Sequence, residues 1–172
     1  MPHHLLLLRH AKSAWDTGVS ADFERPLAKR GKKAARRMGE WMRREGPRPD
    51  YVVSSPAVRA RETVYGVCQA LGIDNDGIHF DRRIYEADLN TLLAVLADCP
   101  QGRDTLLLVG HNPGLEELLG WLCGENTVVP EDGKLMPTAT LACLKLPEDW
   151  SRLAYGCARL DFLTRPRSLP AG

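Results

Sequence analysis

Four consecutive leucines, Leu5 to Leu8, run directly into Arg9 and His10 near the start of the chain. A short apolar run bounded by polar residues is typical of a strand buried on both faces, although its length does not exclude a buried helical segment. Ligands of open α/β sheets bind at the carboxyl ends of the strands, so Arg9 and His10 are candidates for a functional site. A surface arginine and a hydrogen-bonded histidine after a core strand would explain the dipeptide equally well.

The length and composition of the chain favour a single cytoplasmic domain. With 172 residues the chain can bury a core without disulfides or a metal. Because 23 Lys and Arg nearly balance 22 Asp and Glu, the charge predicts neither a nucleic acid nor a membrane as partner. The five cysteines include no C-x-x-C pair, which is typical of reduced cytoplasmic thiols. We expect one domain over residues 1–172, ending in a short Pro-rich tail at 165–172.

Strands alternate with helices along most of the sequence. Apolar runs predict the strands, and apolar residues at helical spacing predict the helices between them. The expected strands lie at about 5–8, 51–53, 78–80, 105–109, 139–146 and 152–163, and the expected helices at about 32–45, 56–71, 89–96 and 113–122. This order predicts an α/β three-layer sandwich, with a mostly parallel central sheet and helices on both faces.

Two of these helices are expected to begin with a capping residue followed by proline. Ser55 precedes Pro56, and Asn112 precedes Pro113. A serine or asparagine side chain accepts a hydrogen bond from the first helical turn, and proline is favoured at the first helical position. We therefore predict Ser55 and Asn112 as N-cap residues.

Three strand ends carry polar residues that suit an anion. Arg9 and His10 follow the first strand, Arg59 lies just after the second, and His111 follows the strand at 105–109. Parallel strands would place these ends at one edge, beside two helix N-termini that attract phosphate. Arginine binds phosphate oxygens in pairs, and histidine can act as nucleophile, acid or hydrogen-bond donor. The sequence thus predicts a phosphoryl site that needs no metal or other cofactor.

The motifs at these strand ends resemble those of the histidine phosphatase superfamily, which has the phosphoglycerate-mutase-like fold. The order and spacing are similar to a short branch that includes the SixA phosphohistidine phosphatases, over about residues 5–145. The matching residues are Arg9-His10 with Lys12, Ser13 and Trp15, then Arg25-Pro26-Leu27 with Gly31, Ser55-Pro56 with Arg59-Ala60 and Thr63, Tyr85-Glu86, and Gly110-His111-Asn112-Pro113.

The resemblance implies a role for each matching position. His10 would be the nucleophile that takes the phosphoryl group as a transient phosphohistidine. Arg9 and Arg59 would clamp the phosphoryl oxygens, and His111 would donate a further hydrogen bond. Ser13 occupies the place of a phosphate-contacting hydroxyl. Water would then hydrolyse the phosphohistidine.

Some positions depart from the family pattern or leave alternatives open. Ala11 stands where the wider family has glycine, and Ala28 stands where serine or threonine would cap the first helix, which costs about 1 kcal/mol. A helix could present Arg61 in place of Arg59. Glu86 lies where many members keep a carboxylate that protonates an alkoxide leaving group, but it could equally be a loop residue, because a leaving imidazole needs less help.

Three functions follow from these residues. The first is a metal-independent phosphatase that acts on protein phosphohistidine through a covalent intermediate on His10. The second is a phosphatase of small-molecule phosphate esters, for which Glu86 would be indispensable. The third, from another class, is a non-catalytic phosphate-binding module, although no phosphate-binding glycine loop of the common kinds is present. Basic residues at 32–44 form the expected solvent face of a helix, and could also attract an acidic protein substrate.

Overall fold

A computed structural model of the chain describes residues 3–15, 17–19, 21–147 and 149–170. The final residues of the predicted tail, 171–172, lie outside this range. Short 3-10 turns occur at Asp22–Glu24, Asn75–Gly77, Arg82–Ile84, Gly124–Asn126 and Pro166–Ser168. The strands and helices are β1 (His3–Arg9), α1 (Lys29–Arg44), β2 (Tyr51–Ser54), α2 (Val58–Leu71), β3 (Ile78–Phe80), α3 (Leu89–Ala97), β4 (Thr105–Gly110), α4 (Gly114–Cys123), β5 (Leu141–Leu146) and β6 (Arg159–Thr164).

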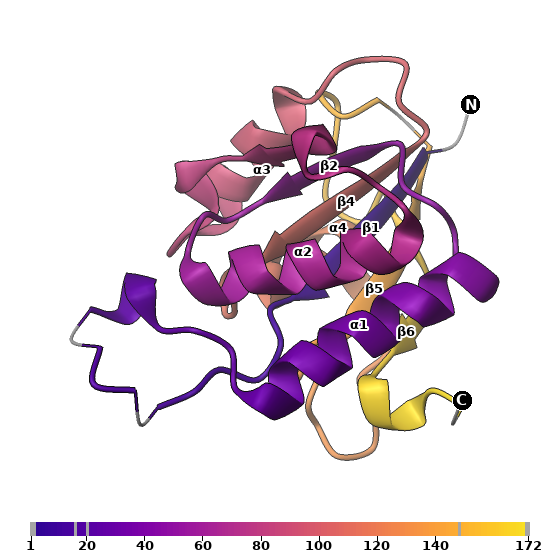
Figure 1. The fold of residues 1–172 in the computed structure, drawn as a ribbon. Coiled ribbons are helices and arrows are strands. Elements are labelled where there is room, and N and C mark those ends of the chain that lie inside the picture. The colour runs from indigo at the N-terminus through magenta and orange to yellow at the C-terminus, as the bar shows by residue number, and fades with distance from the viewer. Residues whose placement is uncertain (1–2, 16, 20, 148, 171–172) are drawn as a thin grey trace.

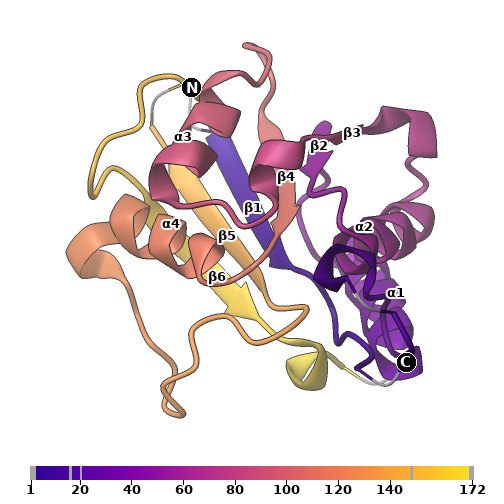
Figure 2. The same ribbon diagram turned by 90° about the vertical axis from the view of Figure 1, so that its left-hand side faces the viewer.

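The described strands form one six-stranded sheet in the order β3, β2, β4, β1, β5, β6. Strands β3, β2, β4 and β1 are parallel, whereas β5 and β6 extend the sheet in antiparallel fashion. Helices α1 and α2 cover one face and α3 and α4 cover the other (Figures 1 and 2). This arrangement confirms the predicted α/β sandwich with a largely parallel central sheet.

The four leucines of β1 alternate between two cores. Leu5 and Leu7 pack in a cluster with α3 and α4, whereas Leu6 and Leu8 pack in a cluster with α1 and α2. All four are 0% exposed. A strand that is covered by helices on both faces has no solvent-facing side, which is why its sequence is uninterrupted leucine instead of an alternating pattern.

The strand register brings three strand ends to one edge of the sheet. Arg9 of β1 lies opposite Gly110 of β4, and Ser54 of β2 lies opposite Val109 of β4. The pairing continues one residue past β2, where the Ser55 backbone N–H donates to the Val109 carbonyl oxygen at 3.0 Å. The polar segments that follow β1, β2 and β4 are therefore neighbours in space, as the sequence predicts.

The prediction that Ser55 caps α2 is wrong. The helix begins at Val58, and its N-cap residue is Ala57, whose backbone is still extended (ψ 141°). Because Ser55 stays paired with β4, the chain needs two more residues before it can turn into the helix. The Ser55 hydroxyl accepts a hydrogen bond from the Ala57 backbone N–H at 3.2 Å and so supports the turn that precedes α2.

Asn112 is likewise not a cap. Helix α4 begins at Gly114, and Pro113 occupies the N-cap position. The Asn112 side-chain amide donates to the Glu116 carboxylate and to the Met136 carbonyl oxygen, each at 2.9 Å. Its Oδ1, the atom that would cap a helix, has no partner among the described residues. The side chain instead ties the start of α4 to the loop that precedes β5.

The last two strands are shorter than predicted. β5 begins at Leu141, because Ala139 has a left-handed backbone (φ +60°) that interrupts the regular extended conformation of a strand. β6 begins only at Arg159. The predicted strand residues before it turn towards the end of α4, where the Ala158 N–H donates to the Leu122 carbonyl oxygen at 2.8 Å. Hydrogen bonds to a helix end thus replace the expected sheet pairing.

The described part of the tail packs against α1. Leu169 is buried in the core that α1 and α2 share, and Arg37 of α1 donates to its carbonyl oxygen at 2.9 Å. Within the described ranges, no helix has both the length and the apolar character needed to cross a bilayer.

Helix α1 begins at Lys29, three residues before the predicted start, and its N-cap residue Ala28 provides no side-chain hydrogen bond. We therefore expect Ala28→Ser to raise the free energy of unfolding by about 1 kcal/mol, because a serine hydroxyl can accept an N–H of the first turn. Urea denaturation measures the change. Ala28→Val is the control and should bring no gain, and an equal gain in both variants would contradict a capping effect.

Candidate active site

Two buried histidines meet at the carboxyl edge of the sheet. His10 follows β1 and His111 follows β4, and their ring centroids are 5.2 Å apart. His10 is 6% exposed and His111 is 8% exposed. The structure thus brings together the two histidines that the sequence predicts for the site.

The hydrogen bond of His10 determines its tautomer. Nδ1 lies 2.8 Å from the backbone carbonyl oxygen of Ala11. A carbonyl oxygen can only accept, so in a neutral ring Nδ1 carries the proton and Nε2 keeps its lone pair. Ala11 is itself fixed, because its backbone N–H donates to the Thr63 hydroxyl at 3.0 Å. The imidazole is therefore oriented with Nε2 as its nucleophilic atom.

His111 has the same tautomer but is held through its other ring nitrogen. Its Nε2 lies 2.8 Å from the Ser55 hydroxyl oxygen, which already accepts a bond from the Ala57 N–H. The hydroxyl hydrogen of Ser55 is free to donate to Nε2, and on this hydrogen-bond pattern we assign the ring proton to Nδ1. That Nδ1 is buried and has no partner among the described residues. His111 thus presents a hydrogen-bond donor, which fits the donor role that the family resemblance implies.

Burial keeps both histidines neutral at physiological pH. Desolvation lowers the pKa of His10 to about 4, the Ala11 carbonyl partly opposes this shift, and the nearby charges of Arg59 and Arg9 lower the pKa further. Desolvation also lowers the pKa of His111 to about 3, with His10 and Arg59 adding to the shift. A neutral imidazole is the form that can attack phosphorus.

Two arginines come to the histidine pair from different elements. Arg9 donates through Nη1 to the Met136 carbonyl oxygen at 3.1 Å. Arg59 lies in the first turn of α2 and is 6% exposed. The alternative residue Arg61 points elsewhere, since it donates to the Pro56 carbonyl oxygen at 3.1 Å and its guanidinium lies 5.6 Å from the Phe80 ring. The structure therefore places Arg59, not Arg61, in the cluster.

Asp22 joins the cluster as a carboxylate partner of its cations. Arg59 donates to the Asp22 backbone oxygen at 2.8 Å and to its Oδ2 at 3.0 Å. The Tyr85 hydroxyl donates to the same Oδ2 at 2.7 Å, and Arg25 donates to Oδ1 at 3.0 Å. The Tyr85 hydrogen bond, followed by those of the arginines, lowers the pKa of Asp22 to about 2. Asp22 is thus ionised and connects the loop at 11–28 to Arg59.

Ser13 and Glu86 lie outside the contacts of the histidine pair. Ser13 is buried, and its hydroxyl accepts a hydrogen bond from Arg25. Glu86 is exposed and has a left-handed backbone (φ +56°). No hydrogen bond or ion pair of Glu86 occurs within the described part of the chain. The structure therefore links Ser13 to Arg59 through two intervening residues, Arg25 and Asp22, and places Glu86 beside Tyr85.

Buried polar atoms without a partner gather at this edge. Most buried polar groups in folded proteins are hydrogen-bonded, so a group of exceptions points to a ligand. In the described ranges, the buried atoms without a partner include Arg9 Nε, Arg25 Nε, Arg59 Nε, His111 Nδ1 and Asn112 Oδ1. Four of these are N–H donors, which suits an anion with several oxygens. The same ranges contain no group of three or more His, Cys, Asp or Glu side chains placed to hold a metal ion.

Sequence reasoning missed three contributors to the site. Ser55 sets the tautomer of His111, yet its position next to proline suggested a helix cap. Tyr85 packs its ring edge-on against His111 with centroids 5.5 Å apart, although the sequence marked it only as a neighbour of Glu86. Asp22 had no distinguishing signal, because an acidic residue in a polar loop is ordinary.

The site lies at the carboxyl edge of a parallel sheet and combines neutral buried histidines, arginine side chains and unpartnered N–H groups. This combination is typical of proteins that transfer or hydrolyse phosphoryl groups. The family model for the histidine phosphatase superfamily (branch 1) matches residues 5–98. The chain belongs to this superfamily and is a phosphatase.

Similar proteins match nearly the whole chain. A protein from Mycobacterium tuberculosis, described as uncharacterized, is 35% identical over 164 residues, which cover 93% of this chain and 100% of the relative. A structure from Agrobacterium tumefaciens, described as a candidate phosphohistidine phosphatase SixA, is 31% identical with a TM-score of 0.80 and covers 96% of this chain and 99% of that chain. A structure from Nakamurella with the same description is 27% identical with a TM-score of 0.83, covering 96% and 97%.

The lowered histidine pKa values predict a loss of stability in mild acid. In the unfolded chain a histidine binds a proton near pH 6.5, whereas folded His10 and His111 bind one only near pH 4 and pH 3. Between these values the unfolded state holds more protons, so stability is full above about pH 6.5 and falls as the pH drops towards 4. We expect a loss on the order of 2 kcal/mol per histidine, measured by urea unfolding across this range.

The variants His10→Asn and His111→Asn should each show a smaller loss over the same range, because each lacks one of the two groups. His79→Asn is the control, since that histidine is exposed on β3. An unchanged unfolding free energy of the native sequence from pH 6.5 to pH 4 would contradict the buried neutral state.

Proposed function

We propose that this phosphatase acts through a covalent phosphohistidine on His10 and that its substrate is a phosphohistidine of another protein. The observation that carries the proposal is the orientation of His10. Its Nδ1–H is held by the Ala11 carbonyl oxygen, and its buried neutral ring leaves the Nε2 lone pair next to His111. A rigid nucleophile beside fixed cations is what phosphoryl transfer requires.

In the first step, the Nε2 lone pair of His10 attacks the phosphorus of the bound phosphohistidine. A new P–N bond forms as the P–N bond to the substrate imidazole breaks, and the leaving imidazole nitrogen takes up a proton from solvent. His10 thereby becomes a phosphoimidazolium that still carries its Nδ1 proton. The Ala11 carbonyl oxygen, 2.8 Å from Nδ1, stabilises the positive charge.

In the second step, water attacks the phosphorus and the P–N bond to His10 breaks. Orthophosphate leaves, one proton of the water passes to the phosphate or to solvent, and His10 returns to its neutral form. Arg9 and Arg59 stabilise the negative charge on the equatorial oxygens in both steps, and His111 Nδ1–H donates to one of these oxygens. No metal ion takes part in these steps.

The choice of a protein substrate rests on the similar structures and on the leaving group. The Agrobacterium and Nakamurella structures, 31% and 27% identical, are both described as candidate phosphohistidine phosphatases. Glu86, the only acid predicted for protonating an alkoxide, makes no described contact with the histidine pair.

The five cysteines are free thiols, which supports the cytoplasmic location expected from the sequence.

The central test is hydrolysis of a phosphohistidine-bearing phosphotransfer domain. We expect the native protein to release phosphate from this domain in the presence of EDTA and to form an acid-labile phosphoenzyme. His10→Asn should reduce the rate at least about 10³-fold, since it removes the nucleophile. His79→Asn, on the distant strand β3, is the matched control and should keep full activity.

Persistence of the phosphohistidine after long incubation with the native sequence would refute the proposal. If the native sequence formed no phosphoenzyme and His10→Ala still bound phosphate normally, the protein would be a phosphate-binding module.

Glu86 separates a phosphohistidine substrate from a small phosphate ester. An alkoxide is a strongly basic leaving group that needs a proton donor, so loss of the general acid lowers the rate of ester hydrolysis about 10²-fold or more. A leaving imidazole does not need such a donor, so we expect Glu86→Gln to change the rate of phosphohistidine hydrolysis by less than about 3-fold. The measurement compares both substrates in both proteins, with Glu45→Gln at the far end of α1 as control. A large loss of phosphohistidine hydrolysis in Glu86→Gln would instead favour a small phosphate ester as the substrate.

A further inference from the structure

A second pocket lies beside the proposed phosphoryl site. Its volume is about 510 Å³, and it is open to solvent and bordered by Lys12, the start of α1, the loop before β5 and the chain after β6. The lining residues are Lys12, Arg30, Ala34, Lys134, Pro137, Thr138, Ala139, Arg165, Pro166 and Arg167. None of the proposed catalytic side chains lines it.

The lining of this basic pocket is rich in cations. Arg165 is held in place by the Asp132 carboxylate at 2.6 Å and by the Lys134 carbonyl oxygen at 2.6 Å. Arg167 lies 3.3 Å from the same carboxylate. Within the described part of the chain, no carboxylate lies within ion-pair distance of the three other cations, Lys12, Arg30 and Lys134. Five cations therefore face a single neutralising carboxylate.

Four of the lining residues are apolar. Ala34, Pro137, Ala139 and Pro166 contribute methyl groups and proline rings. A lining of cations together with apolar side chains suits a ligand whose negative group sits on a short hydrocarbon stem, as in glutamate and aspartate side chains. A second phosphate group would instead need hydrogen-bond donors close to it on several sides.

The pocket shares a wall with the phosphoryl site. The Ala139 N–H donates to the carbonyl oxygens of Arg9 and His10 at 3.1 and 3.0 Å, so the pocket lining is bonded directly to the nucleophile's backbone. Lys12 lies two residues after His10. Helix α1 approaches this segment so closely at Gly31 that an added Cβ would collide with the Lys12 carbonyl oxygen. One substrate can therefore reach both places.

We propose that this basic pocket binds acidic side chains that flank the phosphohistidine of the protein substrate. The inference rests on the proposed function and adds to it a sequence requirement on the substrate. The peptide backbone next to the phosphohistidine would cross the shared wall, and its carboxylates would pair with Arg30 and Lys134, which both line the pocket.

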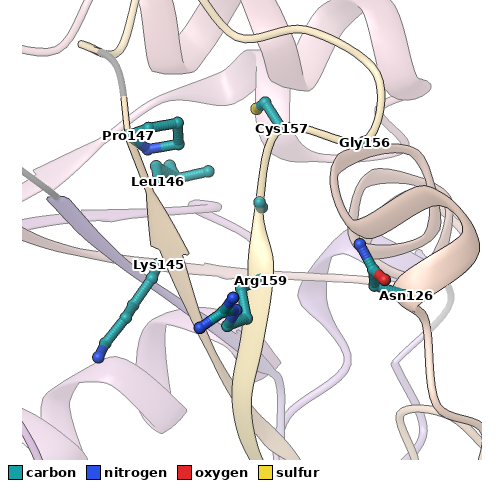
Figure 3. A pocket seen from close by; sticks show the side chains of 8 residues that line it. Asn126, Lys145, Leu146, Pro147, Gly156, Cys157 and Arg159 are labelled. Carbon is teal, nitrogen blue, oxygen red and sulfur yellow. The ribbon is translucent and has the colours of Figure 1, made fainter.

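Another hollow supplies a matched control. It lies between β5 and β6, where Lys145 and Arg159 are neighbours on adjacent strands (Figure 3). Lys145 pairs with His4 at the beginning of β1, five residues from Arg9 at its end, which corresponds to roughly 16 Å along the strand. Removing these two cations changes the net charge as much as removing Arg30 and Lys134, but far from the phosphoryl site.

The experiment compares two phosphohistidine peptides in the full chain, one with glutamates on both sides of the phosphohistidine and one with glutamines. We expect kcat/KM for the acidic peptide to fall about 5-fold in the double variant Arg30→Gln/Lys134→Gln, through KM, because each exposed ion pair contributes modestly. The glutamine peptide should be unaffected, and added salt should shrink the difference. Lys145→Gln/Arg159→Gln should behave as the native sequence.

The outcomes separate the pocket from the proposed function. If neither peptide is hydrolysed by the native sequence, the proposed function fails. If the native protein hydrolyses both peptides equally well, only the pocket proposal fails. It also fails if the two double variants lose kcat/KM for the acidic peptide equally, because the cations then act by long-range attraction. If Arg30→Gln/Lys134→Gln instead impairs hydrolysis of fructose 1,6-bisphosphate and spares the acidic peptide, the pocket binds a small molecule and the proposal is wrong.

Discussion

Burial of β1 on both faces is the constraint on which the rest of this structure depends. Its leucines fill two cores at once, so the strand cannot shift or rotate without opening one of them. Backbone bonds then fix the residues at its end, because the His10 N–H donates to the Gly110 carbonyl oxygen at 3.0 Å while Ala139 binds the carbonyls of Arg9 and His10. The proposed nucleophile is thus held by the fold itself, which is the arrangement that positioning catalysis needs.

The electrostatics of the site follow from that burial. A histidine removed from water and surrounded by arginines loses its proton readily, which leaves His10 and His111 neutral next to permanent positive charge. Each neutral ring then has one nitrogen committed to a neighbour, Ala11 for His10 and Ser55 for His111. Both rings carry their proton on Nδ1, but they differ in which nitrogen is left free, the Nε2 lone pair in His10 and the Nδ1–H in His111. One ring can therefore attack phosphorus while the other donates to a phosphoryl oxygen.

The loop at 11–28 joins this site through Asp22. In Figure 1 the loop extends from the body of the protein, and its 3-10 turn brings the Asp22 carboxylate to Arg59, Arg25 and Tyr85. Both terminal nitrogens of Arg59 bind Asp22. A phosphoryl group that binds Arg59 therefore shares this arginine with a carboxylate of the protein, which links the position of the loop to the occupancy of the site.

The sequence by itself determined the sandwich fold, the order of its elements and the meeting of Arg9, His10 and His111, because local patterns of apolar residues predict which strands are buried and parallel. The choice of Arg59 over Arg61 came from the structure. Only the tertiary structure decided what the neighbouring polar residues do. Ser55 and Asn112 have the local pattern of helix caps, yet contacts with residues distant in sequence direct them to His111 and to Met136. Local patterns report what a residue can bond nearby, whereas a hydroxyl or amide takes whichever partner the packing of distant segments brings within reach.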